Sequence, residues 1–200
     1  MKKVLFIDGC LRGELSRTKR LGAAFLKELP LDRFTVERVD LNALELLPLN
    51  REALEKRDAL VDAGEYDNVM FEVARQIASA DMIVVAAPFW DMGIPAKLKT
   101  YLEHASVAGL TFRVEANGDC VGCCKASALV YLSTRGMNIA DGDEMEQATP
   151  YLRAVSKFFG IADFHTVSAW GLDMISEAEV EARVRAAAEE AAALAQSFTE

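Results

Sequence analysis

Apolar and polar positions follow two different periods along the chain. Short, mostly apolar runs are typical of buried strands, and apolar residues that recur every three or four positions are typical of amphipathic helices. The first pattern predicts strands at residues 2–8, 34–40, 82–88, 127–134 and 164–171. The second predicts helices at residues 16–29, 51–63, 66–80, 95–105 and 148–160, and from Ser176, which forms a capping box with Glu179.

Five strands that alternate with helices predict an α/β fold, with a parallel sheet covered by helices on both faces. Right-handed crossovers favour a doubly wound sheet of strand order 2-1-3-4-5, and they place a ligand crevice at the carboxyl ends of its first, third and fourth strands. Residues 111–126 add a hairpin, because Asn117-Gly118 is a strong turn signal. No linker rich in proline, glycine or serine divides the chain, so we expect one domain over residues 1–200.

The composition is that of a soluble globular protein, with 52% hydrophobic and 26% charged residues among 200. The formal net charge of -9 argues against nucleic-acid binding, because phosphates require a basic face. The apolar run within residues 1–8 is too short for a signal peptide, and no stretch approaches the ~20 apolar residues of a membrane span. These features predict a cytoplasmic protein.

The loop after the first strand, "DGCLRGELSRT", has the features of an anion site. Ser16 and Thr18 bring hydroxyl groups to a helix start, where backbone N–H groups are unpaired and the dipole favours negative charge. Arg12, Arg17 and Lys19 add a positive charge that the chain as a whole lacks. The spacing matches neither a Walker loop nor G-x-G-x-x-G. A capped helix with solvated bases is the alternative interpretation.

Two further loops are predicted at the same crevice. "PFWDMG" (residues 88–93) follows the third strand, and a loop rarely exposes Phe, Trp and Met to solvent. It is either a hydrophobic plug, a dimer contact, or the wall of a site for a flat ring. "STRGM" (residues 133–137) follows the fourth strand and offers polar backbone groups. Together the three loops indicate a mononucleotide with a flat ring, and flavin mononucleotide (FMN) fits best.

At this point the sequence resembles the flavodoxin-like FMN-dependent NADH azoreductases, also described as quinone reductases. The resemblance runs nearly the whole chain and is carried by "SRT" (16–18), "APFWDMGIPAKLKTYLEHASVAGLTF" (87–112), "ANG" (116–118), "STRGM" (133–137) and "TPYLRAVSKFFGI" (149–161). It implies a homodimer with two active sites at the subunit interface.

The resemblance also implies which residues hold FMN. The phosphate would be bound around Ser16, Arg17 and Thr18, with help from the position of Cys10. The ring would be held by Phe89, Trp90, Asp91, Met92, Thr134, Arg135, Gly136 and Met137.

Three of these positions depart from the family. Cys10 replaces a serine, Asp91 stands where asparagine is typical, and Met137 replaces a second glycine. A carboxylate only accepts hydrogen bonds, so Asp91 could accept from the flavin N3–H and could not donate to a ring oxygen. The departures bear on flavin potential and substrate choice more than on flavin binding.

The predicted activity is an FMN-dependent NAD(P)H oxidoreductase that passes two electrons to quinones or azo compounds by ping-pong hydride transfer. The flavin carries the chemistry, so no catalytic side chain is predicted. A flavodoxin-type electron carrier and a non-enzymatic binding domain on the same fold are the alternatives.

The remaining chemistry-bearing residues have structural interpretations. "CVGCC" brings together Cys120, Cys123 and Cys124, whose spacing matches no standard zinc or iron–sulfur motif, so we expect thiols and no metal. A redox-active thiol pair is a weaker alternative. His104 and His165 have no motif partner and are expected to be structural.

Overall fold

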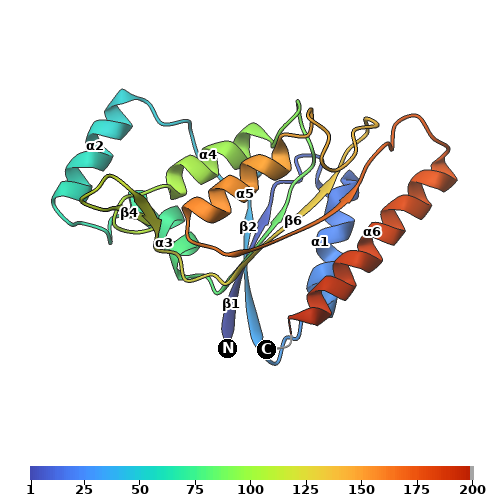
Figure 1. Ribbon diagram of the computed structural model, residues 1–200, viewed down its shortest axis with the longest axis horizontal. Coiled ribbons are helices and arrows are strands. Elements are labelled where there is room, and N and C mark those ends of the chain that lie inside the picture. Colours follow the sequence, from blue (N-terminus) through green and yellow to red (C-terminus); the bar gives the residue numbers. More distant parts are fainter. Residues whose placement is uncertain (199–200) are drawn as a thin grey trace.

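A parallel sheet of five strands forms the centre of the molecule (Figure 1). The computed structural model describes residues 1–198. The strand order is β2-β1-β3-β6-β7, which confirms the predicted 2-1-3-4-5 topology. The strands are β1 (Lys2–Asp8), β2 (Phe34–Asp40), β3 (Met82–Ala86), β6 (Ala128–Thr134) and β7 (Asp163–Ala169).

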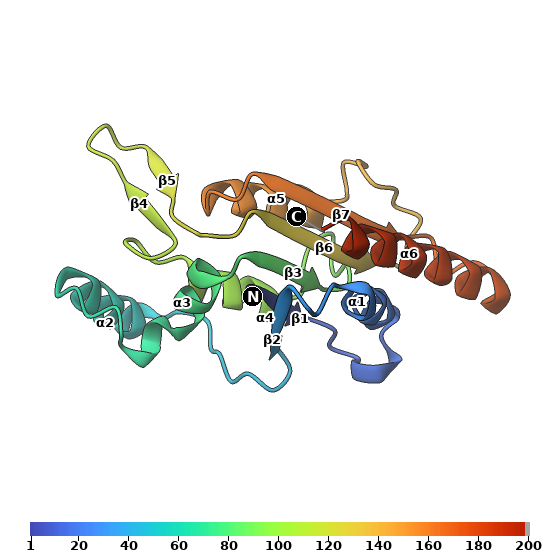
Figure 2. The ribbon, with the colours of Figure 1, turned by 90° about the horizontal axis from the view of Figure 1, so that it is seen from below.

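Helices cover both faces of this sheet because successive strand residues point to opposite sides. In β1, Leu5 and Ile7 pack in the core beneath α3, α4 and α5, whereas Val4 and Phe6 pack beneath α1 and α6. The latter two helices lie side by side (Figure 2). The helices are α1 (Arg17–Glu28), α2 (Arg51–Asp62), α3 (Glu72–Ser79), α4 (Ala96–Ala105), α5 (Ala148–Phe158) and α6 (Glu177–Ser197).

One predicted helix begins later than its apolar pattern indicates. Residues 66–80 were predicted as helical, but α3 begins only at Glu72, after the short 3₁₀ turn η2 (Val69–Phe71). The side chain of Asn68 accepts a hydrogen bond from the backbone N–H of Met70. Asparagine competes in this way for backbone donors, which favours a helix start over a helix interior. The capping box at Ser176 is confirmed.

The predicted hairpin at residues 111–126 is present and projects from the body of the molecule (Figure 2). It consists of β4 (Phe112–Val114) and β5 (Cys120–Gly122), with Gly118 in the turn at a φ of 87°. Its base packs closely on the end of α5: a Cβ atom on Gly122 would lie 1.9 Å from the backbone nitrogen of Gly160. The hairpin is therefore anchored at its base, away from the carboxyl ends of β1 and β3.

None of the helices within residues 1–198 combines the length and apolar character needed to cross a bilayer. In the same part of the chain, no three His, Cys, Asp or Glu side chains are arranged to hold a metal ion.

Candidate functional site

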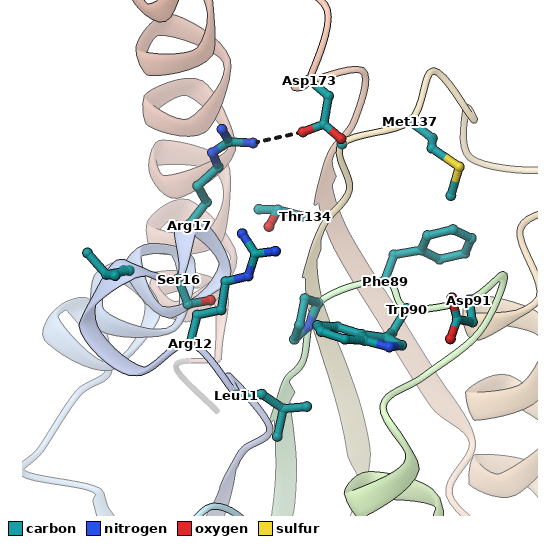
Figure 3. A pocket seen from close by; sticks show the side chains of 13 residues that line it. Leu11, Arg12, Ser16, Arg17, Phe89, Trp90, Asp91, Thr134, Met137 and Asp173 are labelled. Atoms are coloured by element: carbon teal, nitrogen blue, oxygen red, sulfur yellow. Dashed lines mark ion pairs between the residues drawn. The ribbon is translucent and has the colours of Figure 1, made fainter.

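A cavity of about 470 Å³ opens where the sheet topology predicts a ligand crevice. Its walls come from the loops that follow β1, β3 and β6, and from the segment after β7 (Figure 3). The lining residues are Leu11, Arg12, Leu15, Ser16, Arg17, Pro88, Phe89, Trp90, Asp91, Thr134, Gly136, Met137 and Asp173.

One end of the cavity is cationic and rich in hydrogen-bond donors. Ser16 is the N-cap of α1, but its side chain makes no capping hydrogen bond. The first N–H groups of α1 therefore have no side-chain cap, which is the arrangement that favours a bound anion. The Arg12 side chain makes no hydrogen bond or ion pair with other residues of 1–198, and Figure 3 shows its guanidinium group inside the cavity. The Arg17 guanidinium group forms an ion pair with Asp173 at 3.6 Å.

The opposite end of the cavity is aromatic and is built on a tight turn (Figure 3). Trp90 and Gly93 exchange two backbone hydrogen bonds of 2.9 Å. The two residues between them, Asp91 and Met92, have positive φ angles of 45° and 63°. Aspartate tolerates the left-handed conformation, whereas for most side chains it costs about 1–2 kcal/mol. The Trp90–Gly93 turn is therefore strained at Met92, and such strain persists only where the surrounding structure holds it.

The loop after β6 completes the wall with Thr134, Gly136 and Met137. Gly136 lies directly against the carboxylate of Asp173, and a Cβ atom there would be 1.8 Å from its Oδ2. The backbone N–H of Asp173 donates to the carbonyl of Gly136 at 3.0 Å. A side chain at position 136 would therefore displace the Asp173 carboxylate from the cavity wall. Met137 follows it at the aromatic end, with 41% of its surface exposed.

Four of the residues predicted to bind a cofactor have side chains outside the cavity wall. The Cys10 thiol points to the carbonyl of Ala86 at 3.5 Å, and burial raises its pKa to about 12. The Thr18 hydroxyl is paired with that of Thr134 at 2.7 Å, between α1 and β6. The Met92 side chain packs on the core below α4. Arg135 is also turned inward, with 3% of its surface exposed.

The other eight predicted residues do line one cavity: Ser16, Arg17, Phe89, Trp90, Asp91, Thr134, Gly136 and Met137. Pro88 belongs to the segment 88–93 that was predicted as a possible wall, and Arg12 was predicted only as a charge near the anion site. The wall residues Leu11, Leu15 and Asp173 were not predicted. Asp173 had a usable signal, because it follows the last predicted strand at the same edge of the sheet. Nothing in the sequence marks Leu15, whose side chain is 87% exposed.

The neighbouring bases at the start of α1 are already paired. Lys19 contacts Glu14 at 2.6 Å, and Arg20 contacts Glu181 at 2.6 Å. The cation available to a ligand is therefore supplied by Arg12 and Arg17. The cavity can accommodate an elongated molecule that is anionic at one end and flat and aromatic at the other.

Comparison with known proteins gives a consistent picture. A family described by its flavodoxin-like fold matches residues 2–195. The chain is 33% identical over 203 residues to the FMN-dependent NADH:quinone oxidoreductase 2 of Clostridium acetobutylicum, with 99% of this chain and 100% of that protein covered. It is 35% identical over 183 residues to the FMN-dependent NADH:quinone oxidoreductase of Rhizobium meliloti, with 86% and 87% covered.

Among solved structures, an azoreductase from Bacillus anthracis superposes with a TM-score of 0.86 at 28% sequence identity. The superposition covers 99% of this chain and 100% of that one.

Proposed function

The chain belongs to the family with the flavodoxin-like fold, and on that basis we propose that it is an FMN-dependent NADH:quinone oxidoreductase that also reduces azo compounds. The observation that carries this proposal is the two-ended cavity. Its cationic end lies at the N-terminus of α1 and its aromatic end at the Trp90–Gly93 turn. Relatives that carry this activity in their names are similar to the chain over nearly its full length.

The residues present fit FMN at both ends of the cavity. Ser16, Arg12 and Arg17 would hold the phosphate together with the backbone of α1. Phe89 and Trp90 would bound the ring, with the backbone at Gly136 near its polar edge. When bound, FMN would supply the two-electron chemistry that links NADH or NADPH to a quinone or azo compound.

The chain's own residues bind and orient the reactants. Trp90 is 41% exposed at the mouth of the cavity and offers an apolar surface against which donor and acceptor would lie in turn. Because the donor and the acceptor would occupy the same surface in turn, we expect ping-pong kinetics. No side chain is required to move a proton in the hydride step, so we assign no catalytic residue.

The test is to release the cofactor by heat and to assay the purified protein. FMN is expected on chromatography, with turnover of NADH against quinones and azo dyes. Reduction of the flavin absorption band by NADH alone would exclude a pure electron carrier. Recovery of FAD, or a protein that cannot be loaded with FMN, would contradict the proposal. A parallel assay with NADPH defines the donor.

We further propose a cytoplasmic homodimer with two active sites at the subunit interface. The support is the family resemblance, the four free cysteines, and the exposed apolar side chains of Leu15 and Trp90 at the cavity mouth. Sedimentation analysis should give twice the chain mass. A protein that stays monomeric at assay concentrations would contradict the dimer.

Asp91→Asn is expected to raise the flavin midpoint potential by about 20–60 mV. Reduced flavin gains negative charge, which a neighbouring carboxylate opposes. For a two-electron couple, about 30 mV corresponds to 1.4 kcal/mol. The measurement is a dye-coupled potential titration. Asp173→Asn is the matched control, because Asp173 also lines the cavity but lies beside Arg17. Equal shifts in both variants would place Asp91 away from the ring.

Replacing Cys120, Cys123 and Cys124 together with serine is expected to leave FMN content and turnover within about twofold of the wild type, as surface changes distant from a site usually do. The three cysteines lie at the hairpin and none lines the cavity. Burial also raises the pKa of Cys124 to about 12, so it remains a thiol. Metal analysis accompanies the assay. Lost activity together with stoichiometric iron or zinc in the wild type would reveal a metal centre.

A further inference from the structure

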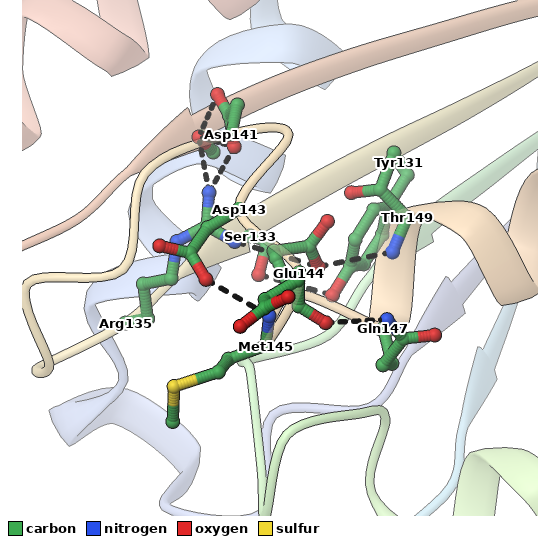
Figure 4. A network of polar contacts seen from close by, with 11 residues as sticks. Tyr131, Ser133, Arg135, Asp141, Asp143, Glu144, Met145, Gln147 and Thr149 are labelled. Atoms are coloured by element: carbon green, nitrogen blue, oxygen red, sulfur yellow. Dashed lines mark hydrogen bonds and ion pairs between the residues drawn. The ribbon is translucent and has the colours of Figure 1, made fainter.

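A buried charge network lies directly behind the cavity wall, between the loop after β6 and the start of α5 (Figure 4). Arg135 is its centre, with a side chain only 2% exposed. Its guanidinium group is paired with the carboxylates of Asp141 and Glu146 and donates to the Ser168 hydroxyl at 3.2 Å. The same group lies 5.6 Å from the ring centroid of Phe89, which lines the cavity.

Glu146 links the Arg135 guanidinium group to α5. Its side chain is 1% exposed, and its Oε1 lies 3.4 Å from Nη1 of Arg135. The same oxygen accepts a hydrogen bond of 3.0 Å from the backbone N–H of Thr149, in the first turn of the helix. A buried carboxylate needs such partners. The Glu146 side chain is therefore held from two directions, by the Arg135 cation and by the start of α5.

The next residue connects α5 to the cavity wall. The backbone N–H of Gln147 donates to the carbonyl of Met92 at 3.0 Å. Met92 is the strained residue of the Trp90–Gly93 turn, with a φ of 63° that a methionine does not favour. A hydrogen bond from outside the turn thus reaches the strained residue, and its donor is the residue that follows Glu146.

We propose that Arg135 and Glu146 are positioning residues that hold the Trp90–Gly93 turn in the conformation that receives the flavin ring. This inference rests on the proposed function, since it assigns the turn to FMN. Arg135 acts on both sides of the turn: its guanidinium group packs on Phe89, and its partner Glu146 fixes the Gln147 donor. Neither side chain touches the ligand cavity.

The test is a double-mutant cycle between Glu146→Gln and Met92→Gly. Glycine adopts positive φ freely, so Met92→Gly removes the strain that the network has to hold. Glu146→Gln keeps an oxygen for Thr149 and removes the charge paired with Arg135. FMN affinity is measured by titrating FMN into the apo-protein and following flavin fluorescence. Met92→Gly also removes the packing of the Met92 side chain. This loss occurs with and without Glu146→Gln, so it cancels in the cycle.

Glu146→Gln is expected to weaken FMN binding about tenfold in the wild-type background and less than about threefold in the Met92→Gly background, the size of coupling typical within one network. Arg135→Lys, which keeps the charge but not the planar fork, should show a smaller loss that Met92→Gly also rescues. Asp141→Asn is the matched control: it contacts the same arginine but not the helix start, so its effect should be equal in both backgrounds.

The positioning role would be overturned if Glu146→Gln lost the same FMN affinity in the wild-type and Met92→Gly backgrounds. It would also be overturned if Met92→Gly rescued Asp141→Asn to the same extent as Glu146→Gln. Either result would leave the network a purely structural role. If the wild type binds no FMN, the proposed function is wrong, but the positioning role can still be tested. The same double-mutant cycle is then measured by thermal unfolding of the apo-proteins. Coupling between Glu146 and Met92 in that readout supports the positioning of the turn, and its absence overturns it.

Discussion

Arg135→Met is expected to destabilise the folded chain by about 3–5 kcal/mol, the usual cost of breaking a buried ion pair from one side. The substitution leaves the Glu146 carboxylate, only 1% exposed, without its cation. Methionine fills much of the same volume, so the loss reflects an unpaired buried charge more than a cavity. The measurement is urea unfolding of the apo-proteins. Equal slopes of unfolding free energy against urea concentration in the wild type and Arg135→Met would show that their denatured states are comparable.

Arg153→Met provides the matched control for this prediction. The Arg153 guanidinium group also lies over an aromatic ring, 4.6 Å from the centroid of Phe164, but the residue is exposed on α5. Exposed contacts of this kind contribute about 0.5–1 kcal/mol. A similar loss in the two variants would show that burial of the Arg135 pair is not what stabilises this part of the fold.

Replacing Arg12 and Arg17 together with alanine is expected to weaken FMN binding by about 1.5–3 kcal/mol, roughly 10- to 150-fold. Both guanidinium groups line the cationic end of the cavity, where they supplement the backbone N–H groups of α1. The backbone donors remain in the variant, so binding is weakened and not abolished. Affinity is measured by flavin fluorescence in titrations of the apo-protein.

Two controls make this second prediction specific for the phosphate. Riboflavin lacks the phosphate, so its affinity should be the same in the wild type and the double variant. Arg20→Ala removes a cation from the same helix that is already paired with Glu181 and does not line the cavity, and it should leave FMN affinity unchanged. An equal loss of riboflavin and FMN would mean that the two arginines shape the cavity without binding phosphate.

The architecture could be predicted from the sequence because the central strands β1, β3 and β6 are buried on both faces. Runs such as residues 82–88 have no polar alternation, and this pattern is typical of a central parallel strand. The crossover rule then determined the strand order. The boundary of α3 could not be predicted, because the apolar positions at residues 69–71 fit a helix equally well. There the competing hydrogen bond of Asn68 decided the outcome.

The candidate site was predictable at the level of loops but not of side-chain directions. Sequence order places three loops at one edge of the sheet, and all three line the cavity. Within those loops, Thr18 and Arg135 point into the protein. Their directions depend on partners in other elements: the hydroxyl of Thr134 lies 116 residues from Thr18, and the carboxylate of Glu146 lies at the start of α5. No local pattern encodes such pairings.

The pairing of α1 with α6 has a consequence for biosynthesis. Phe25 of the first helix packs against Phe198, with ring centroids 6.3 Å apart, and Arg20 is bound to Glu181. About 150 residues separate the two helices along the chain. At about 5–20 residues per second, a ribosome needs roughly 8–30 s to make them. The N-terminus of α1 forms part of the proposed phosphate site. During that time α6 is not yet available to pack against the apolar face of α1. The surface of α1 that packs on α6 therefore stays exposed in the nascent chain until α6 has been made.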